Sequence, residues 1–367
     1  MVIHVAVFFR QLFLISCFFI FKMITITFSF YIYCSNYFFK MKRICFILLS
    51  SVCAFYSNGQ VTWQNLDSLY QPLPSSVHVY KSTDVVDGKP NIMYYAIADL
   101  KNKILQFTTD TASHRRLTPS QFYDRNEHPL LVVNCSFFSF ASNQNLNLVI
   151  KNGKLLSYNQ EDISLKNKEL SEFNHCFLGS FGISKKRTAD VAWTFTDSAS
   201  KKAFASQLPV SCITDSVGKI SWPEVNQQTS LVIGHSGKTS PSFKKWKMKT
   251  AIGGGPVLVQ NAEVKISNNE ERKFGGRAAL NREPRTAIGY TKDQRIIVWV
   301  CEGRSDSAAG LSLIQEAEIL KDLGCVEALN LDGGGSSCML INGKETNTPS
   351  SKGVQRPVPS VFLIEKK

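Results

Sequence analysis

The sequence predicts an α+β fold, with a single mixed-sheet domain that contains a strand–helix–strand unit near the C-terminus. Three observations support this prediction. Apolar runs of strand length, separated by turn residues, predominate from Ile92 onward. One helical pattern, in residues 311–323, follows them. No repeat or low-complexity linker interrupts residues 92–367, so one domain is the simplest organisation.

The strands are expected in the runs 92–100, 130–138, 146–158, 230–237, 250–264 and 286–303. Turn residues at 151–154, 260–263 and 291–294 indicate three hairpins. A weaker helix is expected at 119–123, and 164–172 fits neither period. The helix at 311–323 is predicted from apolar residues three apart, with a glycine placed as its C-terminal cap. These residues are Leu311, Ile314, Ala317, Leu320 and the capping Gly324.

The N-terminal region reads as two segments. Residues 1–40 are rich in Phe, Ile and Tyr and carry no acid, but Arg10 and Lys22 divide them into pieces shorter than the ~20 residues of a membrane span. From Met41 a basic pair, an apolar stretch and small residues are typical of a secretory signal peptide over 41–59. We therefore expect translation to begin at Met41, with 1–40 as upstream sequence. The alternative is a membrane anchor.

That interpretation predicts a periplasmic or secreted protein without a stable membrane span in its mature form. Residues 60–91 would be an entry segment before the main domain at 92–367. Removing 1–59 takes away five basic residues and no acid, so the formal charge falls from +13 to +8. The remaining basic residues are scattered, with clusters at 184–187 and 244–247, which fits a solvated face or an anionic substrate. No nucleic-acid motif is present, so nucleic acid is not an expected partner.

Six cysteines follow residue 59, and none has the spacing of a zinc site. Secretion would permit disulfides, but the sequence does not fix their pairing. Cys301 and Cys325 lie within apolar stretches, so we expect them to be buried as small hydrophobic residues.

The strand–helix–strand unit gives the first argument about a site. The strands 295–301 and 326–331, joined by the helix, are expected to be parallel neighbours with a right-handed crossover. Their C-terminal ends then lie at one edge of the sheet, which is where ligands bind on such sheets. Glu302 and Arg304 leave the first strand there, and Asp332 leaves the second.

Two glycine clusters are expected to line this edge. After Asp332, a turn of Gly333, Gly334 and Gly335 can adopt left-handed backbone angles, bind an anion through its N–H groups and receive help from the hydroxyls of Ser336 and Ser337. The alternative is a tight hairpin with a bulge, capped by Asp332. The second cluster, between two strands, also suggests a cleft lined by bare backbone. It consists of Gly253, Gly254 and Gly255.

Two further polar residues stand beside buried runs. Arg285 comes directly before a strand and offers a planar fork that suits phosphate or carboxylate; the alternative is a surface salt bridge. Asn134 ends a buried run and needs hydrogen-bond partners there; the alternative is an asparagine that forms a turn.

Five segments in this order resemble the phosphodiester glycosidase family. They are 251–262 (AIGGGPVLVQNA), 284–290 (PRTAIGY), 300–304 (VCEGR), 310–324 (GLSLIQEAEILKDLG) and 328–337 (ALNLDGGGSS). The resemblance covers roughly residues 92–364 and includes a closing segment in which Arg356 matches. The chain departs from the family pattern at Cys135, where glycine is usual, and at Glu302, where aspartate is more common.

The resemblance implies hydrolysis of a sugar-1-phosphodiester between the anomeric carbon and the phosphate. Asp332 would then face the anomeric carbon, where a carboxylate stabilises an oxocarbenium-like transition state or attacks it, and Glu302 would be its acid or base partner. Arg285, Arg304, Arg356 and backbone N–H groups would hold the phosphate. The expected partner is a glycan phosphodiester.

Two alternatives belong to other functional classes. In a metal-dependent phosphodiesterase, Asp332 and Glu302 would be oxygen ligands to Ca²⁺ or Mg²⁺, which are the cofactors the sequence allows without requiring. In a non-catalytic module, the same edge would bind envelope glycans without turnover. The sugar, its aglycone and the stereochemical outcome do not follow from the sequence.

Overall fold

The structure is a computed structural model that describes residues 60–160, 162–166, 171–215 and 242–367. The chain divides into two units, Met1–Gln60 and Val61–Lys367, and all that follows concerns the second. The expected signal peptide at 41–59, the upstream segment 1–40 and the strand at 230–237 lie outside the described residues. Within the described part of the chain, no helix is both long and apolar enough to cross a bilayer.

The largest sheet has eight strands, and most of the predicted strands belong to it. In order across the sheet these are β1 (Gln64–Asn65), β2 (Val77–Ser82), β3 (Met93–Asp99), β19 (Arg295–Cys301), β18 (Arg285–Thr291), β20 (Cys325–Asn330), β16 (Val257–Gln260) and β17 (Glu263–Val264).

Three further sheets complete the described fold. The seven-stranded sheet has the order β14 (Lys244–Lys245), β12 (Lys202–Ser206), β11 (Ala189–Asp197), β10 (Leu178–Ser184), β15 (Met248–Gly253), β6 (Val149–Lys151) and β7 (Lys154–Ser157). The five-stranded sheet has the order β22 (Lys344–Glu345), β21 (Met339–Ile341), β5 (Leu131–Asn134), β23 (Ser360–Lys366) and β4 (Leu105–Thr111). The small sheet consists of β13 (Ile213–Asp215), β9 (Ser171–His175) and β8 (Asp162–Lys166).

The predicted α+β class with a mixed sheet is wrong, because the described residues form mostly antiparallel β-structure. The expected parallel pair β19 and β20 are not neighbours. Strand β18 lies between them and pairs antiparallel with both, which satisfies the hydrogen bonds of each strand without direct contact. Since both strands run opposite to β18, they still run in the same direction. Their C-terminal ends therefore lie at one edge of the sheet, as the sequence argument required.

The described helices are short, and α6 (Leu313–Asp322) is the longest. Ser312 begins it with a capping box formed with Gln315, and Gly324 follows it with a φ of 87°. The predicted apolar face of this helix is wrong at Ile314, whose side chain is 43% exposed. Leu313 packs against the sheet instead. The other helical segments are η2 (Asp67–Tyr70), α3 (Pro119–Arg125), α5 (Asn268–Glu271) and η4 (Gly334–Ser336).

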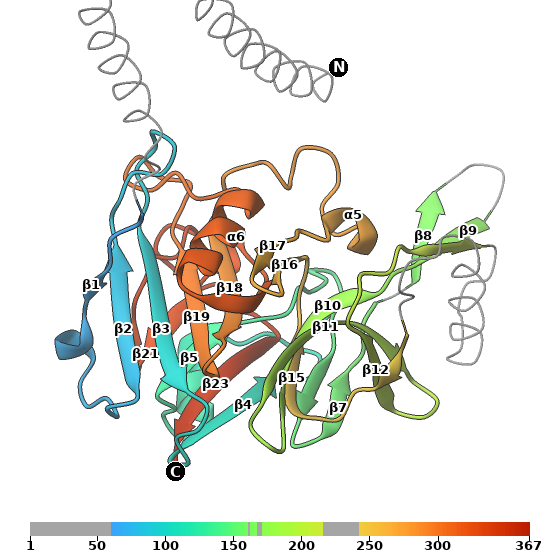
Figure 1. The fold of residues 1–367 in the computed structure, drawn as a ribbon, viewed down its shortest axis with the longest axis horizontal. Helices are drawn as coiled ribbons and strands as arrows, with labels where there is room; N and C mark the ends of the chain where they lie inside the picture. The colour runs from blue at the N-terminus through green and yellow to red at the C-terminus, as the bar shows by residue number, and fades with distance from the viewer. Residues whose placement is uncertain (1–59, 161, 167–170, 216–241) are drawn as a thin grey trace, which may run out of the picture. The chain divides into compact units, whose positions relative to one another are not determined.

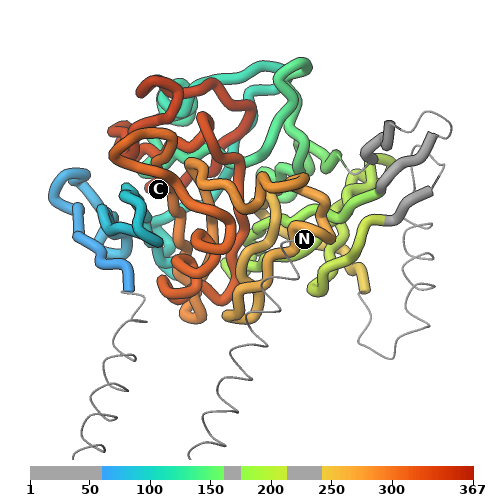
Figure 2. The backbone as a smooth tube through the Cα atoms, turned by 90° about the horizontal axis from the view of Figure 1, so that it is seen from above, coloured from blue at the N-terminus to red at the C-terminus, as the bar shows by residue number. Residues whose placement is uncertain are grey.

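The hydrophobic core lies on both faces of the eight-stranded sheet, because side chains of a strand alternate between faces. On β19, Val298 and its alternate neighbours join the main cluster, which includes residues of the seven- and five-stranded sheets. Trp299 and Ile297 point to the other face and pack in the cluster that contains Leu313, Ala317 and other residues of α6. Figure 1 shows α6 covering this sheet. Both views show red C-terminal segments beside teal segments of the first third of the chain (Figures 1 and 2), consistent with β23 pairing β4 and β5.

The glycine cluster of Gly253, Gly254 and Gly255 carries the chain from one sheet to another. Strand β15 ends at Gly253 in the seven-stranded sheet, and β16 begins at Val257 in the eight-stranded sheet. Asn330, the last residue of β20, forms hydrogen bonds with this connection between the two sheets. Its carbonyl accepts from the Gly255 N–H at 2.8 Å, and its Nδ2 donates to the Gly255 carbonyl at 2.7 Å. A Cβ on Gly254 would lie 2.4 Å from the Asn330 carbonyl oxygen, so a side chain does not fit there.

The sequence made a specific prediction for two of the cysteines, and the structure agrees with it. Cys301 and Cys325 are buried free thiols, which confirms their prediction as small hydrophobic residues. Cys176 and Cys212, whose pairing the sequence left open, form a disulfide.

Replacing Gly254 by alanine should destabilise the fold by about 1–3 kcal/mol, because the new methyl group must displace the Asn330 backbone. The matched control is Gly275→Ala, where no atom lies within 4 Å of the added Cβ and the change should stay within about 0.5 kcal/mol. Urea unfolding of both variants measures the difference. Equal stability of the two variants would show that the crossing tolerates a side chain.

Candidate active site around Asp332

Asp332 is held by its backbone immediately beyond β20. Its N–H donates to the carbonyl of Cys135 at 2.8 Å, and its own carbonyl accepts from Asn134 Nδ2 at 2.5 Å. Asn134 is fully buried at the end of β5, and its Oδ1 accepts from Thr286 Oγ1 and from the Cys338 N–H. The predicted site residue Asn134 therefore fixes the main chain of Asp332 rather than presenting its amide to a ligand.

The glycine cluster of Gly333, Gly334 and Gly335 forms a tight turn from the eight-stranded to the five-stranded sheet. Gly334 has a φ of 60°, and its N–H donates to the carbonyl of Pro284 at 2.8 Å. A Cβ on Gly335 would lie 2.1 Å from Nη2 of Arg356, and one on Gly334 would lie 3.1 Å from Nη2 of Arg304. The glycines are needed here because two guanidinium groups approach the bare backbone of the turn.

The Asp332 carboxylate receives hydrogen bonds from the Ser336 hydroxyl and from the backbone of Gly333. Burial raises the pKa of Asp332 from its ordinary 3.8 to about 6, although these bonds and the charges of Arg356 and Lys273 act in the opposite direction. Its Oδ2 is buried and has no hydrogen-bond partner among the described residues. Oδ2 of Asp332, a carboxylate whose pKa is perturbed, is thus available to a ligand or a reacting atom.

Arg356, which the resemblance places at the phosphate, contributes a positively charged side chain to the turn. Its Nη1 donates to Ser336 Oγ at 3.3 Å, so the same hydroxyl contacts both the guanidinium and the Asp332 carboxylate. The Arg356 guanidinium also lies 5.5 Å from the ring centre of Phe140, a side chain that is 63% exposed. An exposed aromatic face beside charged groups is a surface on which a sugar ring can pack.

Lys273 was not among the predicted residues. Burial lowers its pKa to about 8, while the carboxylates of Glu271 and Asp332 act to raise it. Its Nζ lies 3.7 Å from the ring centre of Phe137, which stands shortly after Asn134 in the chain. The lysine stands in a loop after α5, where no strand or helix period marks it. The neighbouring glycines, Gly275 and Gly276, were its only local signal.

Arg304 lies over the glycine turn but is also paired. Its Nε donates to Glu283 Oε2 at 2.7 Å, and its side chain is 49% exposed. It has a φ of 66°, which is uncommon for a residue with a side chain. Arg304 therefore adds positive charge at the solvent side of the turn, with Glu283 holding its orientation.

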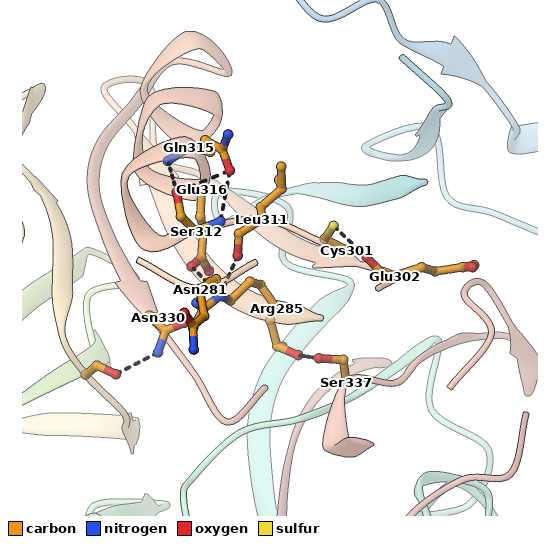
Figure 3. Close-up of polar contacts among 12 residues, drawn as sticks. Asn281, Arg285, Cys301, Glu302, Leu311, Ser312, Gln315, Glu316, Asn330 and Ser337 are labelled. Atoms are coloured by element: carbon orange, nitrogen blue, oxygen red, sulfur yellow. Dashed lines mark hydrogen bonds and ion pairs between the residues drawn. The ribbon is translucent and has the colours of Figure 1, made fainter. Parts of the chain in front are cut away.

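Arg285 does not reach this turn. Its guanidinium is 3% exposed and donates to the carbonyls of Leu311 and Asn281, both at 2.9 Å. Glu316 Oε2 lies 4.0 Å away from its Nε. Figure 3 shows this cluster at the start of α6, so Arg285 supports the fold below the site and is not a surface salt bridge either.

Glu302 also lies apart from Asp332. The two strands that carry them are separated by β18, so two interstrand spacings, on the order of 10 Å, divide their ends. Glu302 Oε1 accepts from the Thr348 N–H at 2.9 Å, and its side chain points away from the Arg285 cluster (Figure 3). Burial raises the pKa of Glu302, against the effects of this hydrogen bond and of Lys81. The structure thus places the carboxylates of Glu302 and Asp332 at the same edge of the eight-stranded sheet but not next to each other.

The remaining predicted residues have structural contacts. Ser337 Oγ accepts from Thr286 Oγ1 at 3.0 Å in the interior, whereas Ser336 faces the site. The N–H groups of Gly253, Gly254 and Gly255 donate to carbonyls of the protein, so these glycines serve the sheet crossing.

The donor set around Asp332 does not fit a divalent cation. Within the described residues no three His, Cys, Asp or Glu side chains come together at metal-binding distance. The charged neighbours that influence the Asp332 carboxylate are Arg356 and Lys273, and positive side chains oppose a bound Ca²⁺ or Mg²⁺. The arrangement fits an anion beside a carboxylate better than a metal.

Comparisons with known proteins show what this chain is similar to. Residues 214–365 match the family model described as phosphodiester glycosidase. The chain is 38% identical over 100 residues to mouse (Mus musculus) N-acetylglucosamine-1-phosphodiester alpha-N-acetylglucosaminidase, covering 27% of this chain and 19% of that protein. It is 34% identical over 102 residues to the SPbeta prophage-derived uncharacterized protein YomE of Bacillus subtilis, covering 28% and 16%. The chain thus spans less than a fifth of the length of these two relatives.

A solved structure extends the likeness in fold. The catalytic domain of zebrafish N-acetylglucosamine-1-phosphodiester alpha-N-acetylglucosaminidase aligns with a TM-score of 0.51 and 19% identity, over 86% of this chain and 91% of that chain. The resemblance to the phosphodiester glycosidase family that the sequence predicted is confirmed.

Replacing Asp332 by asparagine should stabilise the fold in a pH-dependent way. The folded-state pKa of about 6 lies above the ordinary 3.8, so the native state binds more protons between these values and loses stability as pH rises through them. The variant lacks this loss, and its advantage should grow from pH 4 to pH 6 and then remain constant. Thermal unfolding across pH 3–8 measures it, with the exposed Asp306→Asn as control. A stability difference independent of pH would contradict the buried carboxylate.

Proposed function

We propose that this chain, whose residues 214–365 match the model of the phosphodiester glycosidase family, is a secreted hydrolase that cleaves the sugar–phosphate C–O bond of glycan sugar-1-phosphodiesters. The N-acetylglucosamine-1-phosphodiesters named for its relatives give the first substrate to test. One observation carries the proposal: a partly free carboxylate, Asp332, stands beside Ser336 and the cationic Arg356 and Lys273. The signal-like segment that begins at Met41 supports secretion to the periplasm or beyond.

The positive side chains suit the phosphate of such a substrate. A phosphodiester carries one negative charge, and Arg356 offers it a planar fork while Lys273 offers a point charge. Arg304 adds charge at the exposed side of the turn. As the bond breaks, the departing phosphate gains a second charge, so cations that already surround it stabilise the transition state more than the ground state.

Asp332 is the residue assigned to the anomeric carbon. A carboxylate facing that carbon stabilises the positive charge of an oxocarbenium-like transition state or attacks it directly. The hydrogen bonds from Ser336 and Gly333 orient the group, and the partnerless Oδ2 is the oxygen available for this role. With a pKa of about 6, the carboxylate is ionised at neutral pH.

The other residues take supporting roles in the proposal. A phosphate leaving group is a weak base and needs little protonation, so Glu302 is more useful in activating water than in protonating the leaving group. Asn134 and Ser337 fix the backbone of the turn, and Arg285 fixes the strand beneath it. Phe140 offers a packing surface to the sugar ring.

Asp332→Asn should lower turnover by on the order of 100- to 1,000-fold, by analogy with the loss of a group that stabilises transition-state charge. The assay uses N-acetylglucosamine-1-phosphodiester of a methyl glycoside, with products followed by phosphorus and proton NMR. Wild type should release N-acetylglucosamine and a phosphomonoester. Asp306→Asn is the matched control and should keep full activity. Release of a sugar-1-phosphate would indicate a phosphodiesterase, and binding without turnover in wild type would indicate a non-catalytic glycan-binding module.

The pH dependence of kcat/KM should be bell-shaped between about 6 and 8. Activity falls below pH 6 because Asp332 becomes protonated, and it falls above pH 8 because Lys273 loses its charge. In Lys273→Arg the upper limb should move beyond pH 9.5, since arginine stays charged. An acid limb near pH 4, or an upper limb that stays near 8 in the variant, would contradict these assignments.

A further inference from the structure

A second charged region lies at the far end of the seven-stranded sheet from Asp332. A cavity of about 780 Å³ opens there between the turns that connect β6 with β7, β10 with β11 and β11 with β12, and the segment that precedes β15. Six lysines line it, and the cavity is called the lysine cleft below. They are Lys185, Lys186, Lys201, Lys202, Lys245 and Lys247.

No carboxylate among the lining residues neutralises the positive charge of the lysine cleft. All six lysines are exposed, and none forms an ion pair with a carboxylate of the described residues. No aspartate or glutamate is among the lining residues. Six ammonium groups brought together from three separate segments repel one another, and this repulsion is relieved when an anion binds between them.

Two aspartates on β11, the strand before Lys201 and Lys202, form hydrogen bonds with other partners. Asp190 accepts from Trp246 Nε1 at 2.6 Å and from Gln207. Asp197 accepts from the N–H of Ala199 and from Ser200 within its own turn, and Lys202 contributes to lowering the pKa of Asp197. These acids orient the walls of the cleft and leave most of its positive charge available.

The uncharged lining indicates what kind of anion fits. Asn152, Ser184, Thr188 and Ser200 supply hydroxyl and amide groups, which suit a ligand that carries hydroxyls as well as charge. Trp246 is the one aromatic residue in the lining, and it is 8% exposed. Without an exposed ring, the cleft lacks the stacking platforms that single-stranded nucleic acids use. A phosphate-bearing glycan therefore fits the chemistry best.

Two strands connect the lysine cleft to the candidate active site. Ser184 and Met248, paired across β10 and β15, lie at the cleft end, and Gly253, paired with Ser180, lies at the crossing where Asn330 is bound. The four residue steps from Ser180 to Ser184 span on the order of 13 Å, and Asp332 lies two residues beyond Asn330. The two regions are too far apart for one sugar phosphate, but an extended chain can reach both.

We propose that the lysine cleft binds phosphate groups of a glycan with several phosphodiester linkages, at a distance from Asp332. This inference rests on the proposed function, because it makes the substrate a polymer of sugar phosphates of which one linkage is cleaved. The remote charges would hold the chain, so that the polymer binds more tightly than a single sugar-1-phosphodiester.

The test measures binding and does not depend on turnover. Fluorescence anisotropy would compare the full chain with Lys185→Gln/Lys201→Gln/Lys245→Gln, using a labelled oligosaccharide with four phosphodiester linkages and the same oligosaccharide without phosphate. The matched control is Lys89→Gln/Lys265→Gln/Lys321→Gln, which removes three exposed lysines outside the cleft. Thermal unfolding confirms that both variants are folded.

The phosphorylated oligosaccharide should bind wild type at least 10-fold more tightly than the unphosphorylated one, with an affinity that falls as salt rises. The cleft variant should lose at least 10-fold in affinity and much of the salt dependence, while the control variant should match wild type. Equal binding of both oligosaccharides, or equal affinity of the two variants, would overturn the proposal. Tighter binding of an oligonucleotide or of anionic vesicles through the same lysines would overturn the glycan assignment.

The outcome separates this inference from the proposed function. If wild type binds the phosphorylated chain through these lysines but hydrolyses no sugar-1-phosphodiester, the cleft assignment stands and the catalytic proposal fails. If a single sugar-1-phosphodiester is hydrolysed but the cleft variant binds the oligosaccharide as wild type does, the reverse holds.

Discussion

The hydrogen bonds between Asn330 and Gly255 join two sheets at the point from which the candidate active site is built. The chain leaves the seven-stranded sheet through Gly253–Gly255 and enters the eight-stranded sheet, where Asn330 ends β20. Because a Cβ at Gly254 would collide with the Asn330 carbonyl, the approach depends on bare backbone. Asp332 follows two residues later, so its position depends on this crossing. The second glycine turn then leads into the five-stranded sheet, and both glycine clusters are therefore crossings between sheets.

A carboxylate held at such a turn is costly to the fold and useful for chemistry. Burial raises the pKa of Asp332 and lowers that of Lys273, which brings both values toward neutrality. The opposite charges of Arg356 and Lys273 moderate the cost to Asp332 without removing it. Strain and desolvation of this kind are typical of catalytic sites, where stability is lower than it could be. An inert hairpin would not need the charges that surround this turn.

The sequence was informative where a local pattern determines structure. The cap at Gly324, the buried thiols of Cys301 and Cys325 and the direction of β19 and β20 all follow from neighbouring residues or short connections. The pairing of β18 between β19 and β20 is a long-range choice that no local period encodes. For this reason the mixed sheet was predicted wrongly although both strands end at the same edge.

The same distinction between local pattern and long-range packing applies to the candidate site. The structure brings Asp332, Ser336 and Arg356 together. Arg285 lies apart from them, because its guanidinium donates to carbonyl groups near the start of α6. A strand-end arginine looks the same in sequence whether it points to a ligand or to its own backbone. Lys273 lies in a loop without periodicity, so only the tertiary fold brings it to Asp332.

The central claim is that the bond between the anomeric carbon and the phosphate oxygen breaks beside Asp332. Hydrolysis of the N-acetylglucosamine-1-phosphodiester in ¹⁸O-labelled water tests it most directly, with mass spectrometry of both products. We expect the label in the anomeric hydroxyl of the released sugar and none in the phosphomonoester. Label in the phosphate would show that the P–O bond breaks and would contradict the account.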